Sequence, residues 1–202
     1  MSERFADLKK IPKEPAARML AMANAKLKTK LALPVSAPVQ TVLEALEAEG
    51  ATVDILRLFS VALPARERVW WACLAARDYI GEAPENNTPS LAAAEAWVFK
   101  PNEENCERAR ATLDTAEVDD DTVHCANAVV FADGTLGPGE LKHHPGPVGA
   151  SEVSAFAMNI VALGKNADMI EKYGQRLIDR AVDIARGGSG RVAAAAAEPQ
   201  EG

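Results

Sequence analysis

The chain has 202 residues, a mass of 21.5 kDa and a formal net charge of −7, from 22 Lys plus Arg and 29 Asp plus Glu. This length indicates one domain, or one domain with a tail, that can bury a core without disulfides or structural zinc. The acidic balance argues against a nucleic-acid-binding protein, because phosphate contacts need a basic surface. The high alanine content favours helices, because alanine loses no side-chain entropy on entering a helix.

Residues 1–35 are expected to form a lysine-rich, partly ordered amino arm. Three prolines interrupt this arm, so at most one short helix can form there, around Glu14 to Ala25. The arm also holds the only concentration of basic residues in the chain. These residues are Lys9, Lys10, Lys13, Arg18, Lys26, Lys28 and Lys30. We interpret the arm as a solvated, flexible segment, and the alternative is that it binds an anionic partner surface.

Residues 36–186 carry apolar residues at helical spacing and are expected to form the domain. Prolines, glycines and capping residues mark where successive helices begin and end. The expected segments are 36–50, 52–62, 64–81, 88–100, 102–116, 119–132, 150–163 and 167–186. No segment alternates apolar and polar residues as a strand does. The sequence therefore predicts a single-domain, all-α bundle of six to eight helices.

The segment 64–81 is the most informative of these helices. Its apolar stripe, at a spacing of 3.6 residues, consists of Val69, Ala72, Cys73, Ala76 and Ile80. By the same reasoning Val53 and Ile170 are expected to face inward on their own helices. Asp119 to Asp121 are expected to form the first turn of a helix, where acidic residues complement the helix dipole.

Two further segments lack helical periodicity. Residues 133–149 contain five glycines and three prolines and are expected to form a loop. The run Gly187-Gly188-Ser189-Gly190 begins residues 187–202, which have too little apolar variety to pack and are expected to form a flexible, disordered carboxyl tail. The expected organisation is thus an amino arm over 1–35, a helical domain over 36–186 and a tail over 187–202.

The residues that could carry catalysis or bind a metal are scattered. His124 and Cys125 are adjacent on a helix, so their side chains point in directions about 100° apart. His143 and His144 lie in the glycine-rich loop without a third ligand at a suitable spacing. No phosphate-binding loop, nucleophile elbow or zinc-protease motif occurs in the sequence. We therefore expect no metal and no cofactor, and the sequence favours a non-enzymatic protein.

The three cysteines, Cys73, Cys106 and Cys125, are an odd number at wide spacings. Cys73 and Cys106 fall on apolar stripes, where cysteine behaves as a small hydrophobic residue, and this usage indicates a reducing compartment. The amino end, Met-Ser-Glu-Arg, shows no apolar leader, and no segment approaches about 18 uninterrupted apolar residues. We expect a cytoplasmic protein without stable membrane insertion.

The most unusual feature is Trp70-Trp71, preceded by Arg66-Glu67-Arg68. Neighbouring residues on a helix point in different directions, so the two indoles flank the apolar stripe. They either seal two neighbouring helices or present one indole to a partner, since Trp and Arg are frequent in interface hot spots. Arg66 lies one turn before Trp70, within reach of stacking on its indole. We predict that Arg66, Glu67, Trp70 and Trp71 form part of a protein-binding surface.

Around these residues the sequence resembles an uncharacterised bacterial family of all-helical domains. The resemblance lies in the segment Leu63-Pro64-Ala65-Arg66-Glu67-Arg68-Val69-Trp70-Trp71-Ala72-Cys73, and in Ala96-Trp97-Val98 followed by Pro101-Asn102-Glu103-Glu104-Asn105. It covers residues 40–115 well and extends more loosely over the helices after the glycine-rich loop. The family carries no assigned catalytic residues and is associated with type VI secretion gene neighbourhoods. The resemblance implies an accessory protein of a secretion apparatus.

Three functions are compatible with these observations. The first is a non-enzymatic adaptor or chaperone-like protein that binds another protein, such as a secretion-system component or effector, and the absence of catalytic motifs favours it. The second is an enzyme whose site assembles from His124, His143, His144 and Asp residues. The third is a membrane-docking protein that uses the helix over 150–163, although the acidic balance and the polar residues in that helix oppose it.

Stability is expected to need neither a metal nor a disulfide, because the cysteines lie on apolar stripes and the chain is long enough to bury a sufficient core. Thermal melting curves recorded with and without a chelator, and with and without a reductant, should coincide. A melting temperature many degrees lower in chelator would instead support a metal site built from the histidines.

Overall fold

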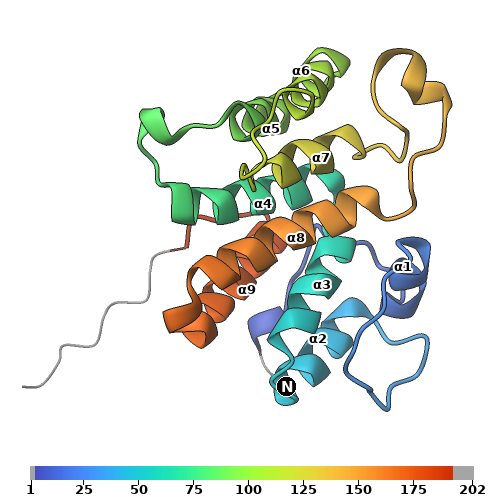
Figure 1. Ribbon diagram of the computed structural model, residues 1–202. Helices are drawn as coiled ribbons and strands as arrows, with labels where there is room; N and C mark the ends of the chain where they lie inside the picture. The colour runs from blue at the N-terminus through green and yellow to red at the C-terminus, as the bar shows by residue number, and fades with distance from the viewer. Residues whose placement is uncertain (1–2, 193–202) are drawn as a thin grey trace, which may run out of the picture.

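A computed structural model describes residues 3–192, which form a single all-α domain of nine α-helices with no strand (Figure 1). The α-helices are α1 (Ala16–Met22), α2 (Val39–Ala48), α3 (Thr52–Ala62), α4 (Ala65–Ile80), α5 (Pro89–Phe99), α6 (Glu103–Leu113), α7 (Val123–Val130), α8 (Ala150–Lys165) and α9 (Ile170–Arg186). Short 3₁₀ helices span Glu3–Phe5, Pro84–Asn86, Gly139–His143 and Ala167–Met169. None of the helices within residues 3–192 is long and apolar enough to cross a membrane.

The expected count of six to eight helices is slightly low. Eight helices lie within the predicted domain, and the ninth, α1, comes from the amino arm. This short helix belongs to the same domain because it buries Ala16 and Leu20 against the core.

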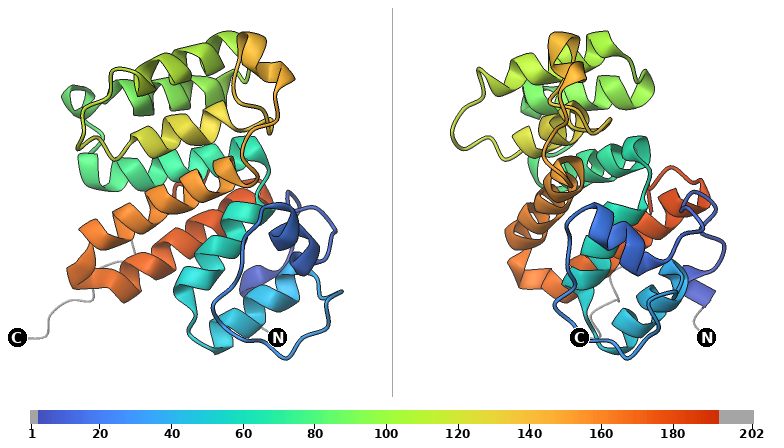
Figure 2. Two further views of the ribbon diagram at one scale, coloured as in Figure 1. Left: turned by 45° about the vertical axis from the view of Figure 1, so that its right-hand side comes forward. Right: turned by 90° about the vertical axis from the view of Figure 1, so that its right-hand side faces the viewer.

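Helices α4 and α8 run through the middle of the molecule and contact helices on both sides (Figure 2). Helices α5, α6 and α7 lie on one side, and α1, α2, α3 and α9 lie on the other. Each side has its own hydrophobic core. Helix α4 contributes Val69, Ala72, Cys73 and Ala76 to the first core and Trp71, Leu74 and Ala75 to the second. The predicted apolar stripe is therefore confirmed as a core-facing stripe, and α4 is buried on a second side as well.

Thr88 and Asn102 begin helices, and Gly81 ends one, as their residue types predict. The side chain of Thr88 accepts a hydrogen bond from the backbone of Leu91 at the start of α5 (3.2 Å). Asn102 does the same for Asn105 at the start of α6 (2.9 Å). Each cap satisfies a backbone N–H that has no partner within the helix. Gly81 ends α4 with φ of +88°, a conformation that favours glycine.

Three local expectations are wrong. The acidic run 119–121 does not form the first turn of α7: Asp120 accepts a hydrogen bond from the backbone nitrogen of Thr122 (2.9 Å), which makes a turn ahead of the helix. Val53 is 41% exposed, because the buried side of α3 is formed by its neighbours from Asp54 onward. Ile170 is 50% exposed, because it lies at the turn between α8 and α9.

The first residues of the amino arm pack on the domain. Phe5 is fully buried, and its ring centroid lies 6.3 Å from that of Phe59 in α3. Arg4 forms ion pairs with Glu47 in α2 and Asp179 in α9, both at 2.6 Å. These contacts attach the amino end of the chain to α2, α3 and α9, and α9 lies far from the other two helices in the sequence. Periodicity alone gives no sign of them, because a single buried aromatic residue forms no pattern.

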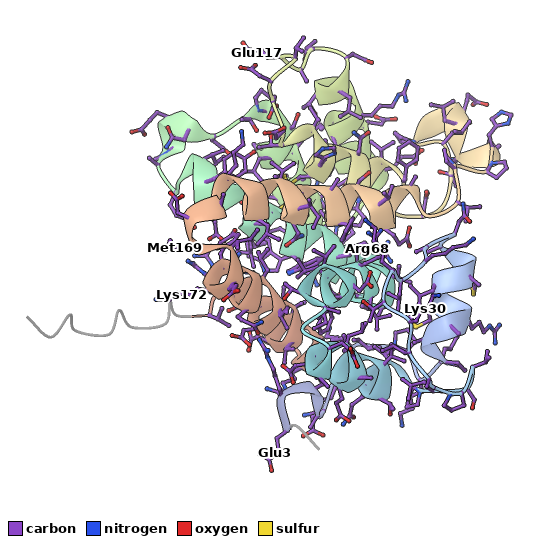
Figure 3. The ribbon with its side chains drawn as sticks, turned by 60° about the horizontal axis from the view of Figure 1, so that its bottom comes forward. Glu3, Lys30, Arg68, Glu117, Met169 and Lys172 are labelled. Carbon is purple, nitrogen blue, oxygen red and sulfur yellow. The ribbon has the colours of Figure 1, made fainter. Side chains whose placement is uncertain are left out.

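A second part of the arm, residues 24–33, lies extended on the surface, and we call it the lysine segment. Its residues alternate between exposed and half-buried. Lys26, Lys28 and Lys30 face solvent (Lys30 is labelled in Figure 3), whereas Ala25, Leu27, Leu31 and Leu33 pack against the core. The segment is thus laid on the domain with its apolar side inward and its lysines outward.

Asp54 of α3 holds the lysine segment in place. One oxygen of this buried carboxylate accepts hydrogen bonds from the backbone nitrogens of Lys28 (2.8 Å) and Thr29 (2.7 Å). Burial raises the pKa of Asp54, but the hydrogen bonds from Thr29 and Lys28 and the charge of Arg57 more than offset this effect. The pKa of Asp54 therefore lies below its ordinary value, which indicates that the charged form is the one the fold stabilises.

We expect Asp54→Ala to release the lysine segment, because two backbone donors lose their acceptor. The change should lower the free energy of unfolding by about 1.5 to 3 kcal/mol, the range for hydrogen bonds to charged groups. Amide hydrogen exchange should show lost protection at Lys28 and Thr29, while amides in α9 stay protected. The exposed Asp168 offers a matched control. Asp168→Ala should change neither measurement.

The same interaction predicts a dependence on pH. Because the pKa of Asp54 is lower in the folded than in the unfolded chain, its contribution is complete above the ordinary value of 3.8 and is lost as the pH falls through the folded value. The difference in stability between the wild type and Asp54→Ala should therefore shrink below about pH 4. A difference that stays constant through this acid range would mean that the carboxylate charge plays no part.

Candidate functional site

The two neighbouring tryptophans of α4 have different environments. Trp71 is fully buried, and its indole nitrogen donates a hydrogen bond to the carbonyl of Leu177 in α9 (3.1 Å). A side chain in this position belongs to the core and is not available to a partner. Trp70 is half-buried and lies at the edge of a surface groove. The structure therefore separates two residues that the sequence treats as equivalent.

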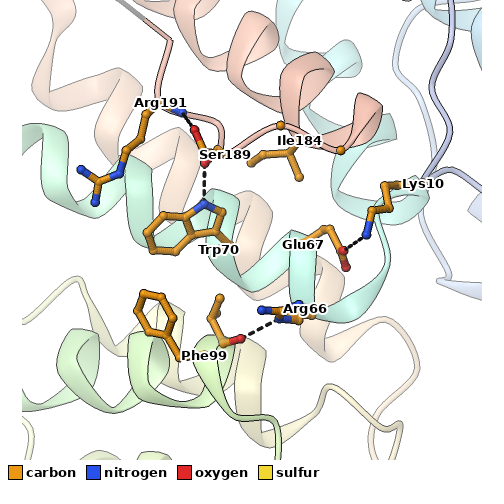
Figure 4. Close-up of a pocket in the computed structure, with 11 residues that line it drawn as sticks. Lys10, Arg66, Glu67, Trp70, Phe99, Ile184, Ser189 and Arg191 are labelled. Atoms are coloured by element: carbon orange, nitrogen blue, oxygen red, sulfur yellow. Dashed lines mark hydrogen bonds and ion pairs between the residues drawn. The ribbon is translucent and has the colours of Figure 1, made fainter.

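The groove beside Trp70 has a volume of about 410 Å³, and we call it the aromatic groove (Figure 4). Its walls are Trp70, Phe99, Arg66, Glu67, Lys10 and the segment 187–191. The rings of Trp70 and Phe99 are tilted by 59° with centroids 6.2 Å apart. Phe99 is 75% exposed, which is a large exposure for an aromatic side chain. The aromatic groove thus combines an apolar surface with charged walls.

Arg66 and Glu67 also line the aromatic groove, but their contacts differ from the stacking of Arg66 on Trp70 that the sequence suggests. The Nε of Arg66 donates to the carbonyl of Val98 (2.6 Å), which ties α4 to α5. The carboxylate of Glu67 forms an ion pair with Lys10 of the amino arm (3.0 Å). The guanidinium that lies over the indole of Trp70 is that of Arg191, at 5.9 Å, and not that of Arg66.

Arg68 of the same motif does not line the aromatic groove and is buried. It forms an ion pair with Glu152 (2.9 Å) and donates a hydrogen bond to Ser151 (3.1 Å) at the start of α8. Burial lowers the pKa of Arg68, and Glu152 acts in the opposite direction. The charged part of the motif is thus divided between the surface and the interface of α4 with α8.

Residues 187–191, which the sequence assigns to a disordered tail, form one wall of the aromatic groove, and we call them the carboxyl strap. The carbonyl of Ser189 accepts a hydrogen bond from the indole of Trp70 (2.7 Å). The backbone nitrogens of Gly188 and Gly190 donate to the backbone and side chain of Asp183, both at 2.8 Å. A Cβ at Gly188 would push that carboxylate away from the backbone nitrogen of Gly190, so glycine at this position favours the strap. The rest of the expected tail, 193–202, lies outside the described residues.

A buried network of hydrogen bonds between α4 and α9 holds the carboxyl strap. Arg180 of α9 donates to the carbonyl of Gly190 (3.0 Å) and forms two hydrogen bonds with Asp78 of α4 (2.8 and 3.1 Å). Tyr173 donates to the same carboxylate (2.6 Å). Burial, followed by the hydrogen bond to Asp78, raises the pKa of Tyr173. These contacts fix the strap to two helices and so fix the hydrogen bond that orients Trp70.

The histidines singled out by the sequence are not brought together with other ligands. His124 is half-buried on α7, and His143 and His144 are exposed in the loop region. Within residues 3–192 no group of three or more His, Cys, Asp or Glu side chains is arranged to hold a metal ion. The three histidines therefore form no metal site with one another in the part of the chain that the structure describes.

The three cysteines are free thiols. Cys73 and Cys125 are buried, and burial raises the pKa of Cys73 well above its ordinary value. Burial also raises the pKa of the half-buried Cys106 to about 11. Cys106 lines a second hollow of about 300 Å³ with Trp97. A nucleophilic cysteine needs a lowered pKa, so the shifts of Cys73 and Cys106 are opposite to the one that catalysis requires.

Sequence reasoning finds Arg66, Glu67 and Trp70 but misses Phe99 and Arg191. Phe99 ends a helix with no regular apolar stripe, so periodicity does not single it out. Arg191 lies in a segment that composition alone assigns to the tail. Two features of the sequence could have pointed to these residues. Phe99 directly follows the Ala96-Trp97-Val98 motif, and the glycines before Arg191 allow the strap to turn back on α9.

We predict that the two tryptophans differ in their effect on stability. Trp71→Ala should lower the free energy of unfolding by about 3 to 5 kcal/mol, as large aromatic truncations in cores do. Trp70→Ala removes one hydrogen bond and part of a surface contact and should cost about 1 to 2 kcal/mol. Urea denaturation of both variants measures the difference. Equal losses would mean that Trp70 is a core residue like its neighbour.

Comparison with known proteins places the chain in a family but assigns it no activity. No curated protein and no solved structure matches it. The sequence pattern described as "Family of unknown function (DUF6931)" matches residues 42–185. This match runs from α2 to the last turn of α9, so it includes the Arg66 to Trp71 motif and Phe99 but stops before the carboxyl strap. Because it covers more than half of the sequence, the chain belongs to this family of unknown function.

Proposed function

We propose that this protein is a non-enzymatic adaptor or chaperone-like accessory protein that binds another protein through the aromatic groove. The observation that carries the proposal is the exposure of Phe99 beside Trp70. Phe99 is 75% exposed and lies against an indole whose orientation is set by the hydrogen bond to Ser189. Removing an exposed aromatic surface from water is favourable, so a partner that covers Phe99 gains free energy. Aromatic and arginine side chains are also frequent in interface hot spots.

The fixed geometry of the aromatic groove supports this role. Trp70 is held by the carboxyl strap, and Arg66 is held by its hydrogen bond to Val98. A surface whose side chains are already ordered loses less conformational entropy when a partner binds. A recognition site gains affinity from pre-ordering of this kind.

The chemistry of the aromatic groove fits binding better than catalysis. No histidine or cysteine lines it within the described residues. Its one carboxylate, Glu67, is paired with Lys10, so it lacks the free acid and base that proton transfer requires. The remaining charged groups are arginines, which stay protonated and act as hydrogen-bond donors.

We further propose that the protein acts in the cytoplasm as an accessory component of type VI secretion. Support for the secretion role comes from the resemblance in the Leu63 to Cys73 segment and the Ala96 to Asn105 segment. Support for the compartment comes from three unpaired cysteines, two of which are buried in apolar surroundings. The partner is then a component or an effector of the secretion apparatus.

We expect Phe99→Ala to abolish capture of a partner from the native host while leaving the fold intact. Surface truncations of this kind change the free energy of unfolding by about 0.5 kcal/mol or less, whereas loss of a hot-spot aromatic residue weakens binding by about 2 kcal/mol or more. Affinity purification followed by mass spectrometry compares the wild type with the variant. Thermal melting of both proteins shows that the fold is kept.

Met169 provides the matched control. It is also a large exposed apolar residue, at 56%, and lies at the turn between α8 and α9 (Figure 3). That turn is separated from the carboxyl strap by the whole of α9, about 25 Å. Met169→Ala should capture the same partner as the wild type. Equal capture by all three proteins would contradict the proposed role of the aromatic groove, and a captured protein unrelated to secretion would contradict the proposed pathway.

A further inference from the structure

We infer that the aromatic groove recognises a short partner segment in which an apolar side chain is flanked by carboxylates. The inference rests on the proposed function and specifies the chemistry of the partner. It starts from the charge of the groove, whose walls carry Lys10, Arg66 and Arg191 against the single acid Glu67. The walls are thus positive by two charges in a chain whose net charge is −7.

The positive charge of the aromatic groove resides on two arginines. Lys10 and Glu67 neutralise each other at 3.0 Å. Arg66 uses its Nε for the carbonyl of Val98, and its two terminal nitrogens have no partner among the described residues. The guanidinium of Arg191 lies over the indole of Trp70 and likewise has no carboxylate partner within residues 3–192. Both groups are exposed and can accept a ligand.

Within residues 3–192, arginines without a carboxylate partner are the minority. The chain has twelve arginines, all within the described residues, and eight of them form an ion pair with Asp or Glu. Two of the remaining four are Arg66 and Arg191. The protein has an excess of acidic residues with which to pair its arginines, yet within residues 3–192 these two have no carboxylate partner and lie on either side of one aromatic pair.

The positions of the two guanidiniums define the ligand. In Figure 4 Arg191 lies on one side of Trp70 and Arg66 lies on the other, with Phe99 beneath the indole. The rings, together with Ile184, offer an apolar surface for one side chain. Guanidinium groups bind carboxylates through paired hydrogen bonds, which are stronger than those between neutral groups. An apolar residue between two acidic residues therefore matches both parts of the groove.

The size and charge of the groove favour a peptide over a nucleic acid. Aromatic and arginine side chains also bind single-stranded nucleic acids, but such proteins follow the phosphate backbone with an extended basic channel. Here the volume is about 410 Å³, and among the described residues that line the groove two cations lack a carboxylate partner. That volume lies at the small end of ligand pockets, which suits one apolar side chain with its immediate neighbours.

The test uses three capped pentapeptides with the full-length protein. Their sequences are glycine-glutamate-phenylalanine-glutamate-glycine, the same peptide with both glutamates replaced by glutamine, and the same peptide with phenylalanine replaced by alanine. Binding is followed by NMR through the indole N–H signals of Trp70. We expect the glutamate-phenylalanine peptide to bind at least tenfold more tightly than either of the other two, and high salt should reduce this preference.

Substitutions test whether Arg66 and Arg191 cause the preference for the glutamate peptide. Arg66→Gln and Arg191→Gln should each reduce affinity for the glutamate-phenylalanine peptide several-fold and leave affinity for the glutamine peptide unchanged. Arg110 is the matched control, because it is exposed, lacks a carboxylate partner within residues 3–192 and lies outside the groove. Arg110→Gln should bind all three peptides as the wild type does.

Other results overturn the inference. If the Trp70 indole signal reports equal affinities for the glutamate and glutamine peptides, the inferred preference for carboxylates is wrong. The groove would still bind a peptide, so the proposed function would survive. Failure of all three peptides to bind would reject this ligand class, and the purification experiment with Phe99→Ala would separately decide whether the groove binds any protein. Binding of oligothymidylate that depends on Arg66 and Arg191, without peptide binding, would identify a nucleic-acid site instead.

Discussion

The burial of α4 on two sides is the constraint on which the rest of the structure depends. One side of this helix packs Val69, Ala72, Cys73 and Ala76 against α5 and α7, and another packs Trp71 and Leu74 against the core shared with α3 and α9. A helix in this position leaves only a narrow strip for the surface. Trp70 lies on that strip, so its partial exposure follows from the packing of its neighbours on both sides.

The same helix links the core to the aromatic groove. Asp78, on the last turns of α4, binds Arg180, and Arg180 binds the carbonyl of Gly190. Gly190 lies next to Ser189, whose carbonyl accepts the hydrogen bond from Trp70. Burying charged groups costs free energy unless every group is paired, so alternative arrangements of this network that leave a group unpaired are disfavoured. The orientation of a surface indole is thereby set by groups in the interior of the protein.

The distribution of charge gives the molecule two distinct basic regions in an acidic background. The lysine segment is a row of exposed ammonium groups on an extended backbone that Asp54 fixes in place. The aromatic groove instead combines an exposed phenyl ring and a half-buried indole with two guanidiniums that have no carboxylate partner among the described residues. The first region has charge but little exposed apolar area, whereas the second has both. Only the second offers the combination of apolar contact and directed hydrogen bonds on which specific recognition depends.

The sequence by itself determined the helices, most of their ends, the stripe of α4 and the membership of a family, because periodicity and capping are local properties of neighbouring residues. It also singled out Arg66 and Trp70, which both line the aromatic groove. The tertiary structure alone decided that Trp71 is core and Trp70 is not, that Phe5 fills the interior, and that Arg191 returns to the groove. Each of these depends on contacts between residues more than fifty positions apart, which leave no pattern within any single helix.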